Sequence, residues 1–199
     1  IPLGPQGNTV KAMYPAGRDS KAAVRWVHAN ANVYGIHPDY LTVVGGSAGS
    51  YISIMLGASN PEDFRDELSL DEDPTLVTTH LNARSDVATV IDHWGAATML
   101  DLLELRDGES RFDPNDTPIS IVHGRNDPTV DFALGEILRD RCEENGIPYA
   151  FYPFDGGHSA WNTRIDGRSL IELAFDFVVE QQGLEVMAIS VDNPIEDGL

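Results

Sequence analysis

Residues 45–49 read Gly-Gly-Ser-Ala-Gly and match the pattern G-x-S-x-G, in which the central serine can act as a nucleophile. The motif follows residues 41–44, a short β-branched run typical of a strand, and precedes residues 51–57, which have helical spacing. Such a turn holds its serine at the amino end of a helix, where free N–H groups favour a developing negative charge. The pattern therefore predicts Ser47 as a nucleophile; the alternative is a glycine-rich turn with an ordinary capping serine.

A serine hydroxyl is a weak nucleophile at neutral pH, so this chemistry needs a histidine base and an acid that fixes the histidine tautomer. Asp127 follows a predicted strand at residues 119–122, and His158 follows another at residues 149–152. Both residues lie in loops expected at the carboxyl edge of a parallel sheet, the same edge as Ser47. The sequence therefore predicts a catalytic triad in the chain order Ser, Asp, His.

Other histidines and acids fit these roles less well. His93 and His123 end predicted strands; His123 is expected to support the loop that carries Asp127, and His93 to stand near the pocket. Asp131 and Asp155 are the alternative acids, although Asp131 also suits the cap of the helix after it. The remaining histidines, expected at the surface, are His28, His37 and His80.

The candidate residues need a scaffold that brings several strand ends together. Short apolar, β-branched runs alternate along the chain with segments of helical spacing. This alternation implies an α/β fold with a mainly parallel sheet covered by helices on both faces. The predicted strands are residues 41–44, 87–91, 119–122 and 149–152, and the predicted helices are residues 20–34, 51–57, 132–145 and 170–182.

The composition limits the classes of function. The chain has 199 residues, 42% hydrophobic and 23% charged, and we expect one catalytic domain over residues 1–199 with a surface excursion at residues 59–85. A net charge of −19 argues against nucleic-acid or membrane-surface binding, and no stretch suits a membrane span. The single cysteine, Cys142, excludes an intrachain disulfide and a cysteine-rich metal site. No signal peptide is visible, and the composition does not decide the cellular location.

The chain resembles the α/β-hydrolase carboxylesterases, especially the branch near hormone-sensitive lipases and bacterial acetyl or feruloyl esterases. The resemblance covers residues 14–179 and is strongest in a few short motifs. These are residues 14–16, 21–27 and 34–38 before the nucleophile strand, the elbow at 45–49, the acid loop at 123–130 (His-Gly-Arg-Asn-Asp-Pro-Thr-Val) and the histidine loop at 156–158 (Gly-Gly-His).

By this resemblance Ser47 is the nucleophile, His158 the general base and acid, and Asp127 the orienting acid of an enzyme that cleaves small carboxylic esters through an acyl-enzyme. The resemblance implies neither a cofactor nor a metal. It also implies that the backbone N–H of Ala48, directly after the nucleophile, belongs to the oxyanion hole. From their positions close to Ser47, Gly46 and Trp94 are candidates for the substrate pocket.

The sequence departs from the family in two places. Ser50 stands where many relatives have another glycine, and residues 1–46 lack both the family's His-Gly-Gly oxyanion loop and the strands before it. We therefore expect the second oxyanion donor on an upstream segment or a second chain, which would also complete the sheet. Two alternatives stay open. One is a serine peptidase of the prolyl-oligopeptidase type, which usually has an aromatic residue in place of Ala48, and the other is a non-catalytic hydrolase-like binding protein.

Overall fold

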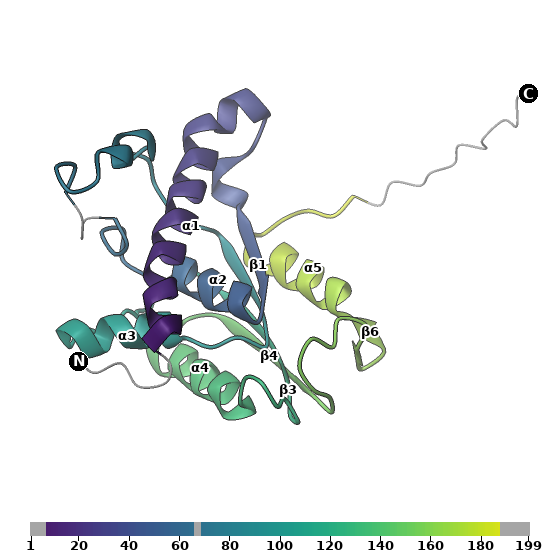
Figure 1. The fold of residues 1–199 in the computed structure, drawn as a ribbon. Coiled ribbons are helices and arrows are strands. Elements are labelled where there is room, and N and C mark those ends of the chain that lie inside the picture. Colours follow the sequence, from purple (N-terminus) through teal and green to yellow (C-terminus); the bar gives the residue numbers. More distant parts are fainter. Residues whose placement is uncertain (1–6, 66–68, 188–199) are drawn as a thin grey trace, which may run out of the picture.

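A parallel four-stranded sheet forms the centre of the computed structural model, which describes residues 7–65 and 69–187 (Figure 1). Its strands lie side by side in chain order: β1 (Thr42–Gly46), β2 (Thr89–His93), β3 (Ile119–Gly124) and β4 (Tyr149–Phe154). All three pairings are parallel, so the strands end at one common edge. The predicted fold class is confirmed, and each observed strand continues two residues beyond its predicted end.

Helices cover both faces of this sheet, as predicted. α2 and α4 pack on one face with α1 outside α2, and α5 lies on the opposite face (Figure 1). The α-helices of the described chain are α1 (Gly7–Tyr34), α2 (Ala48–Ala58), α3 (Thr98–Asp107), α4 (Phe132–Asn145) and α5 (Leu170–Gln181). Shorter elements are the 3-10 helices η1 (Pro38–Tyr40) and η2 (Pro74–Thr78) and the antiparallel pair β5 (Arg164–Ile165) and β6 (Arg168–Ser169).

Helix boundaries follow local capping chemistry where such chemistry is present. α4 has the predicted bounds because Asp131 accepts a hydrogen bond from the N–H of Ala133 and Gly146 adopts a left-handed φ of 72°. α1 differs, because it starts at Gly7 instead of residue 20 and contains Pro15 in its interior. The additional turns are held by tertiary contacts, since Met13 and Tyr14 pack against the core.

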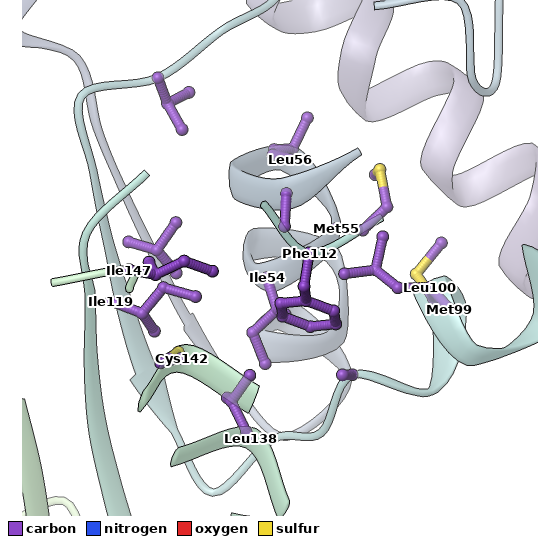
Figure 2. Packing of buried hydrophobic residues seen from close by; sticks show 14 of the residues in the cluster. Ile54, Met55, Leu56, Met99, Leu100, Phe112, Ile119, Leu138, Cys142 and Ile147 are labelled. Carbon is purple, nitrogen blue, oxygen red and sulfur yellow. The ribbon is translucent and has the colours of Figure 1, made fainter. Parts of the chain in front are cut away.

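The main core lies between the sheet and α2. Ile54 and Met55 of α2 have no exposed surface and pack with Val90 of β2 and Ile119 of β3. Figure 2 shows Phe112 beside Ile54 at the centre of this cluster. Burial of each large apolar side chain contributes about 1.5–3 kcal/mol. The packing therefore fixes α2, and with it the amino-terminal end of α2, relative to the strands.

A smaller cluster lies on the other face of the sheet, near α5. Leu170 of α5 packs there with Trp94, which follows β2, with Val122 of β3 and with Phe154 of β4. Trp94 has no exposed surface. The carboxyl ends of three strands are therefore joined on this face by side-chain packing.

The described part of residues 59–85, the segment predicted as a surface excursion, consists of turns and η2. It is nevertheless anchored, because Phe64 and Leu76 are buried and the Asp63 carboxylate lies 2.8 Å from the guanidinium of Arg111. The segment thus contributes to the core, which the many polar residues in its sequence did not indicate.

β1 forms one edge of the sheet. Within the described residues no strand pairs with its outer side, and the side chain of Val44 is 61% exposed. None of the described helices combines the length and the apolar composition that a membrane-spanning helix requires.

Candidate active site

Ser47 occupies the sharp turn between the last residue of β1 and the first residue of α2. Its φ of 55° and ψ of −121° are rare for a residue with a side chain, and such strain costs about 1–3 kcal/mol. The N–H of Ser47 donates to the carbonyl oxygen of His93 over 3.0 Å, which ties the turn to β2. A Cβ on Gly45 would lie 2.3 Å from the backbone of Gly49, so only glycine allows β1 and α2 to approach this closely. The predicted strand, turn and helix are all present.

Asp127 and His158 lie in adjacent loops at the same edge of the sheet. The Nδ1 of His158 lies 2.7 Å from Oδ2 of Asp127. The two loops are in backbone contact, because the N–H of Asn126 donates to the carbonyl oxygen of Gly156 over 3.0 Å. A Cβ on Gly124 would lie 2.5 Å from the same carbonyl oxygen. The structure therefore joins the predicted acid and the predicted base directly.

The carboxylate of Asp127 is held as an anion. Its Oδ1 accepts the N–H groups of Thr129 and Val130 over 2.8 and 2.9 Å, and its side chain has no exposed surface. Burial alone would raise the pKa of Asp127, but the hydrogen bonds from His158, Val130 and Thr129 outweigh it and bring that pKa below its ordinary value. Because an ionised carboxylate only accepts hydrogen bonds, His158 must donate through Nδ1, which leaves Nε2 as a proton acceptor.

A cavity of about 490 Å³ opens beside Ser47, and we call it the Ser47 cavity. It is mainly apolar and brings the acid loop and the nucleophile turn to one space. Within the described residues, no hydrogen bond joins the Ser47 hydroxyl to His158. The residues that line the Ser47 cavity come from α1, the elbow, α2, α3 and the acid loop: Ala12, Met13, Ala16, Ser47, Ala48, Tyr51, Ile52, Met99, Thr129 and Val130.

The alternative base and acids have other surroundings. His93 is buried, which lowers its pKa to about 4 and keeps the ring neutral, and its ring nitrogens have no hydrogen-bond partner within the described chain. The Nε2 of His123 donates to the carbonyl oxygen of Val130 over 3.0 Å, so His123 supports the acid loop as expected. Asp131 caps α4, and the side chain of Asp155 is 93% exposed.

The two candidate pocket residues lie against a third residue that sequence reasoning did not select. Trp94 is fully buried and is not among the residues that line the Ser47 cavity. Gly46 lies against Trp161, since a Cβ on this glycine would come within 2.5 Å of the indole. The only sequence signal for Trp161 is its place three residues after His158. Contact of Trp94 with substrate stays a prediction.

The part of the chain that the structure describes contains no group of three or more histidine, cysteine or acidic side chains arranged to hold a metal ion. The donors at this site are instead a hydroxyl, an imidazole and a carboxylate in hydrogen-bonding loops. Their arrangement suits nucleophilic attack with proton transfer.

The sequence is similar to a protein family and to a protein named as an esterase. The BD-FAE family model matches residues 8–114, more than half of the chain. Esterase LipQ of Mycobacterium tuberculosis is 25% identical over 191 residues, which cover 80% of this chain and 42% of LipQ. The chain thus spans less than half the length of this relative.

Two solved esterase structures are similar to this chain in fold. A truncated carbohydrate esterase from gut microbiota has a TM-score of 0.63 at 23% identity, covering 84% of this chain and 68% of that one. Esterase 2 of Thermogutta terrifontis, phosphorylated by paraoxon, has a TM-score of 0.63 at 25% identity, covering 84% of this chain and 64% of the esterase.

Proposed function

The chain belongs to the BD-FAE family and has the α/β-hydrolase fold that its sequence predicted, and from this premise we propose that it is a carboxylesterase with a Ser47, His158 and Asp127 triad. The observation that carries the proposal is the 2.7 Å contact between His158 and Asp127, at the sheet edge where Ser47 occupies a strained turn. The relatives are named esterases, which favours ester over peptide substrates.

In the proposed first half-reaction, Ser47 Oγ attacks the ester carbonyl while Nε2 of His158 takes the hydroxyl proton. Asp127 keeps Nδ1 protonated and stabilises the imidazolium that forms. The carbonyl oxygen becomes negative at the amino end of α2, where the N–H of Ala48 and the helix dipole favour a negative charge. His158 then protonates the leaving alcohol, and an acyl group remains on Ser47.

In the second half-reaction, water attacks the acyl-enzyme while His158 takes a water proton, and the serine hydroxyl is restored as the acid leaves. The chemistry requires no cofactor. The Ser47 cavity is the proposed site of the acyl group, because it contains Ser47 and Ala48 and its walls are apolar at Met13, Ile52 and Met99.

The proposal includes a further strand and a second oxyanion donor, supplied by a segment outside residues 1–199 or by a second chain. Support comes from the outer side of β1, which has no strand partner among the described residues, and from the exposed Val44. The test is to express residues 1–199 with and without the upstream gene segment. Soluble yield, thermal melting and esterase rate are then compared between the long and the short form. A cooperatively melting and equally active short form would contradict this part of the proposal.

The triad is tested with paraoxon, the reagent that phosphorylates the Thermogutta esterase. Paraoxon or a fluorophosphonate should label Ser47 of the full-length protein, as located by mass spectrometry of peptides. Ser47→Ala should abolish labelling and hydrolysis of short p-nitrophenyl esters, whereas the control Ser59→Ala, after the far end of α2, should keep both.

Labelling of another serine would refute the assignment. The non-catalytic alternative predicts neither labelling nor hydrolysis. The peptidase alternative predicts faster cleavage of peptide amides than of matched esters.

A further inference from the structure

Trp161 is a large aromatic side chain that stays 53% exposed although it lies at the elbow. It is placed by a tight turn after His158, in which Ser159 has a φ of 59° and the N–H of Trp161 donates to the carbonyl oxygen of Ser159 over 2.9 Å. The turn returns the chain toward β1, so the same loop carries both the proposed base and the indole.

The benzene edge of the Trp161 indole contacts the residue just before the nucleophile. A Cβ on Gly46 would lie 2.5 Å from Cζ2 and 2.6 Å from Cη2 of Trp161. Any larger residue at this position would displace the ring. Gly46 thus leaves room for an indole directly beside Ser47.

Two further rings hold the indole in an edge-to-face arrangement. The ring centroids of Trp94 and Trp161 are 4.8 Å apart at 76°, and those of His93 and Trp161 are 5.2 Å apart at 82°. Such geometry is favourable for aromatic pairs. Because Trp94 and His93 are buried, they form a fixed support for the half-exposed Trp161.

The indole and the Ser47 cavity lie on opposite flanks of the nucleophile. Successive residues of a strand point to opposite faces of the sheet. Gly45 faces the α2 backbone, on the side of the cavity, and Gly46 therefore faces the other side, where Trp161 lies. The two flanks provide separate places for the two halves of an ester.

His158 determines which half belongs to which flank. The leaving oxygen must lie close to the imidazole that protonates it. The ring of His158 is 6.2 Å from that of Trp94, which in turn contacts Trp161. From these contacts we assign the alcohol half to the flank of the indole.

We propose that Trp161 is the stacking surface for a ring in the alcohol portion of the ester, an inference that rests on the proposed ester hydrolysis. A ring face against an indole gains dispersion and buries apolar area, whereas a short alkyl chain leaves most of the indole exposed. Aryl alcohols and sugars both carry a ring that can lie against the indole in this way.

The test compares substrates with one acyl group: phenyl acetate, 6-O-acetylglucose and ethyl acetate. In the full-length protein, Trp161→Ala and Trp161→Leu should each lower kcat/KM about tenfold for a ring-bearing ester, mainly through KM, and leave ethyl acetate within about twofold. Trp161→Phe should restore most of the loss. Trp26→Ala removes a tryptophan of similar exposure (44%) from α1 and should leave kcat/KM unchanged for ring-bearing esters and for ethyl acetate.

A loss confined to phenyl acetate identifies an aryl alcohol, and a loss confined to acetylglucose identifies a sugar. Equal losses on all three esters, or no loss, overturn the inference and leave Trp161 as a packing residue. Since the indole is half exposed, its removal creates little buried space, and melting curves check that the variants fold. Paraoxon labelling of Ser47 in each variant separates this inference from the proposed function, because failure of the triad abolishes labelling in the unmodified protein too.

Discussion

Replacement of Asp127 by asparagine changes one atom of the proposed triad and reverses one hydrogen bond. Oδ1 of Asp127 accepts two backbone N–H groups, from Thr129 and Val130, and Oδ2 faces His158. In Asp127→Asn the amide oxygen takes the Oδ1 position, because only an acceptor satisfies two donors there. The amide NH₂ then faces Nδ1 of His158 and must donate to it.

This reversal places the imidazole proton on Nε2, the nitrogen that should accept the proton of Ser47. We therefore expect kcat to fall by about 10⁴, the loss known for the same substitution in a serine protease triad. That factor corresponds to about 5.4 kcal/mol in the activation barrier. The fold should persist, because the two backbone hydrogen bonds that shape the acid loop remain.

The assay is p-nitrophenyl acetate hydrolysis by the full-length protein, combined with thermal melting. Asp131→Asn is the matched control, since Asp131 lies four residues away and caps α4, a role in which asparagine performs equally well. It should keep both rate and melting temperature. A loss below tenfold in a well-folded Asp127→Asn protein would refute the assignment of Asp127 as the orienting acid.

Three further substitutions test the structure around the triad. Gly45→Ala places a Cβ 2.3 Å from backbone and should destabilise the fold by about 1–3 kcal/mol, whereas Gly49→Ala, with no atom within 4 Å, should not; equal melting temperatures would contradict this. Burial raises the pKa of Asp92 to about 7, so the native state binds more protons than the unfolded state between about pH 4 and 7, and stability falls as pH rises through that range. In urea unfolding, the difference in unfolding free energy between Asp92→Asn and the unmodified protein should therefore shift in favour of the variant from pH 4 to pH 8. A difference that does not change with pH would contradict this prediction. Trp94→Ala removes a fully buried indole and should cost about 3–5 kcal/mol, measured by urea unfolding; a change in ester chain-length preference with little loss of stability would instead make Trp94 a pocket residue.

The sequence was sufficient for the elements whose signals are local. Residues 42–44 are β-branched and stop at glycines, and the helix at 132–145 has an aspartate before it and a glycine after it. The triad candidates also follow from local order, because parallel strands bring their carboxyl-terminal loops to one edge. Ser47, Asp127 and His158 could therefore be selected without knowledge of the packing.

Other features depend on contacts between distant segments. Pro15 is a usual sign of a helix end, but Met13 and Tyr14 pack on the core and α1 continues through it. α3 buries Met99, Leu100 and Leu103 but has no clear apolar stripe in its sequence. Trp161 meets Gly46 only because the histidine loop folds back over β1. A single sequence does not encode these contacts in any short pattern.

The hydroxyl of Ser50, at a position where the resemblance to the esterases implies a glycine, helps to hold the strained elbow. Its hydroxyl donates to the carbonyl oxygen of Gly45 over 2.6 Å and accepts the N–H of His93 over 2.9 Å, and it has no exposed surface. A glycine at this position could make neither bond. Two hydrogen bonds of about 1 kcal/mol each are comparable to the 1–3 kcal/mol of strain at Ser47. The hydroxyl therefore ties β1 and β2 together one helical turn after the nucleophile and supports the strained turn that holds the proposed catalytic serine.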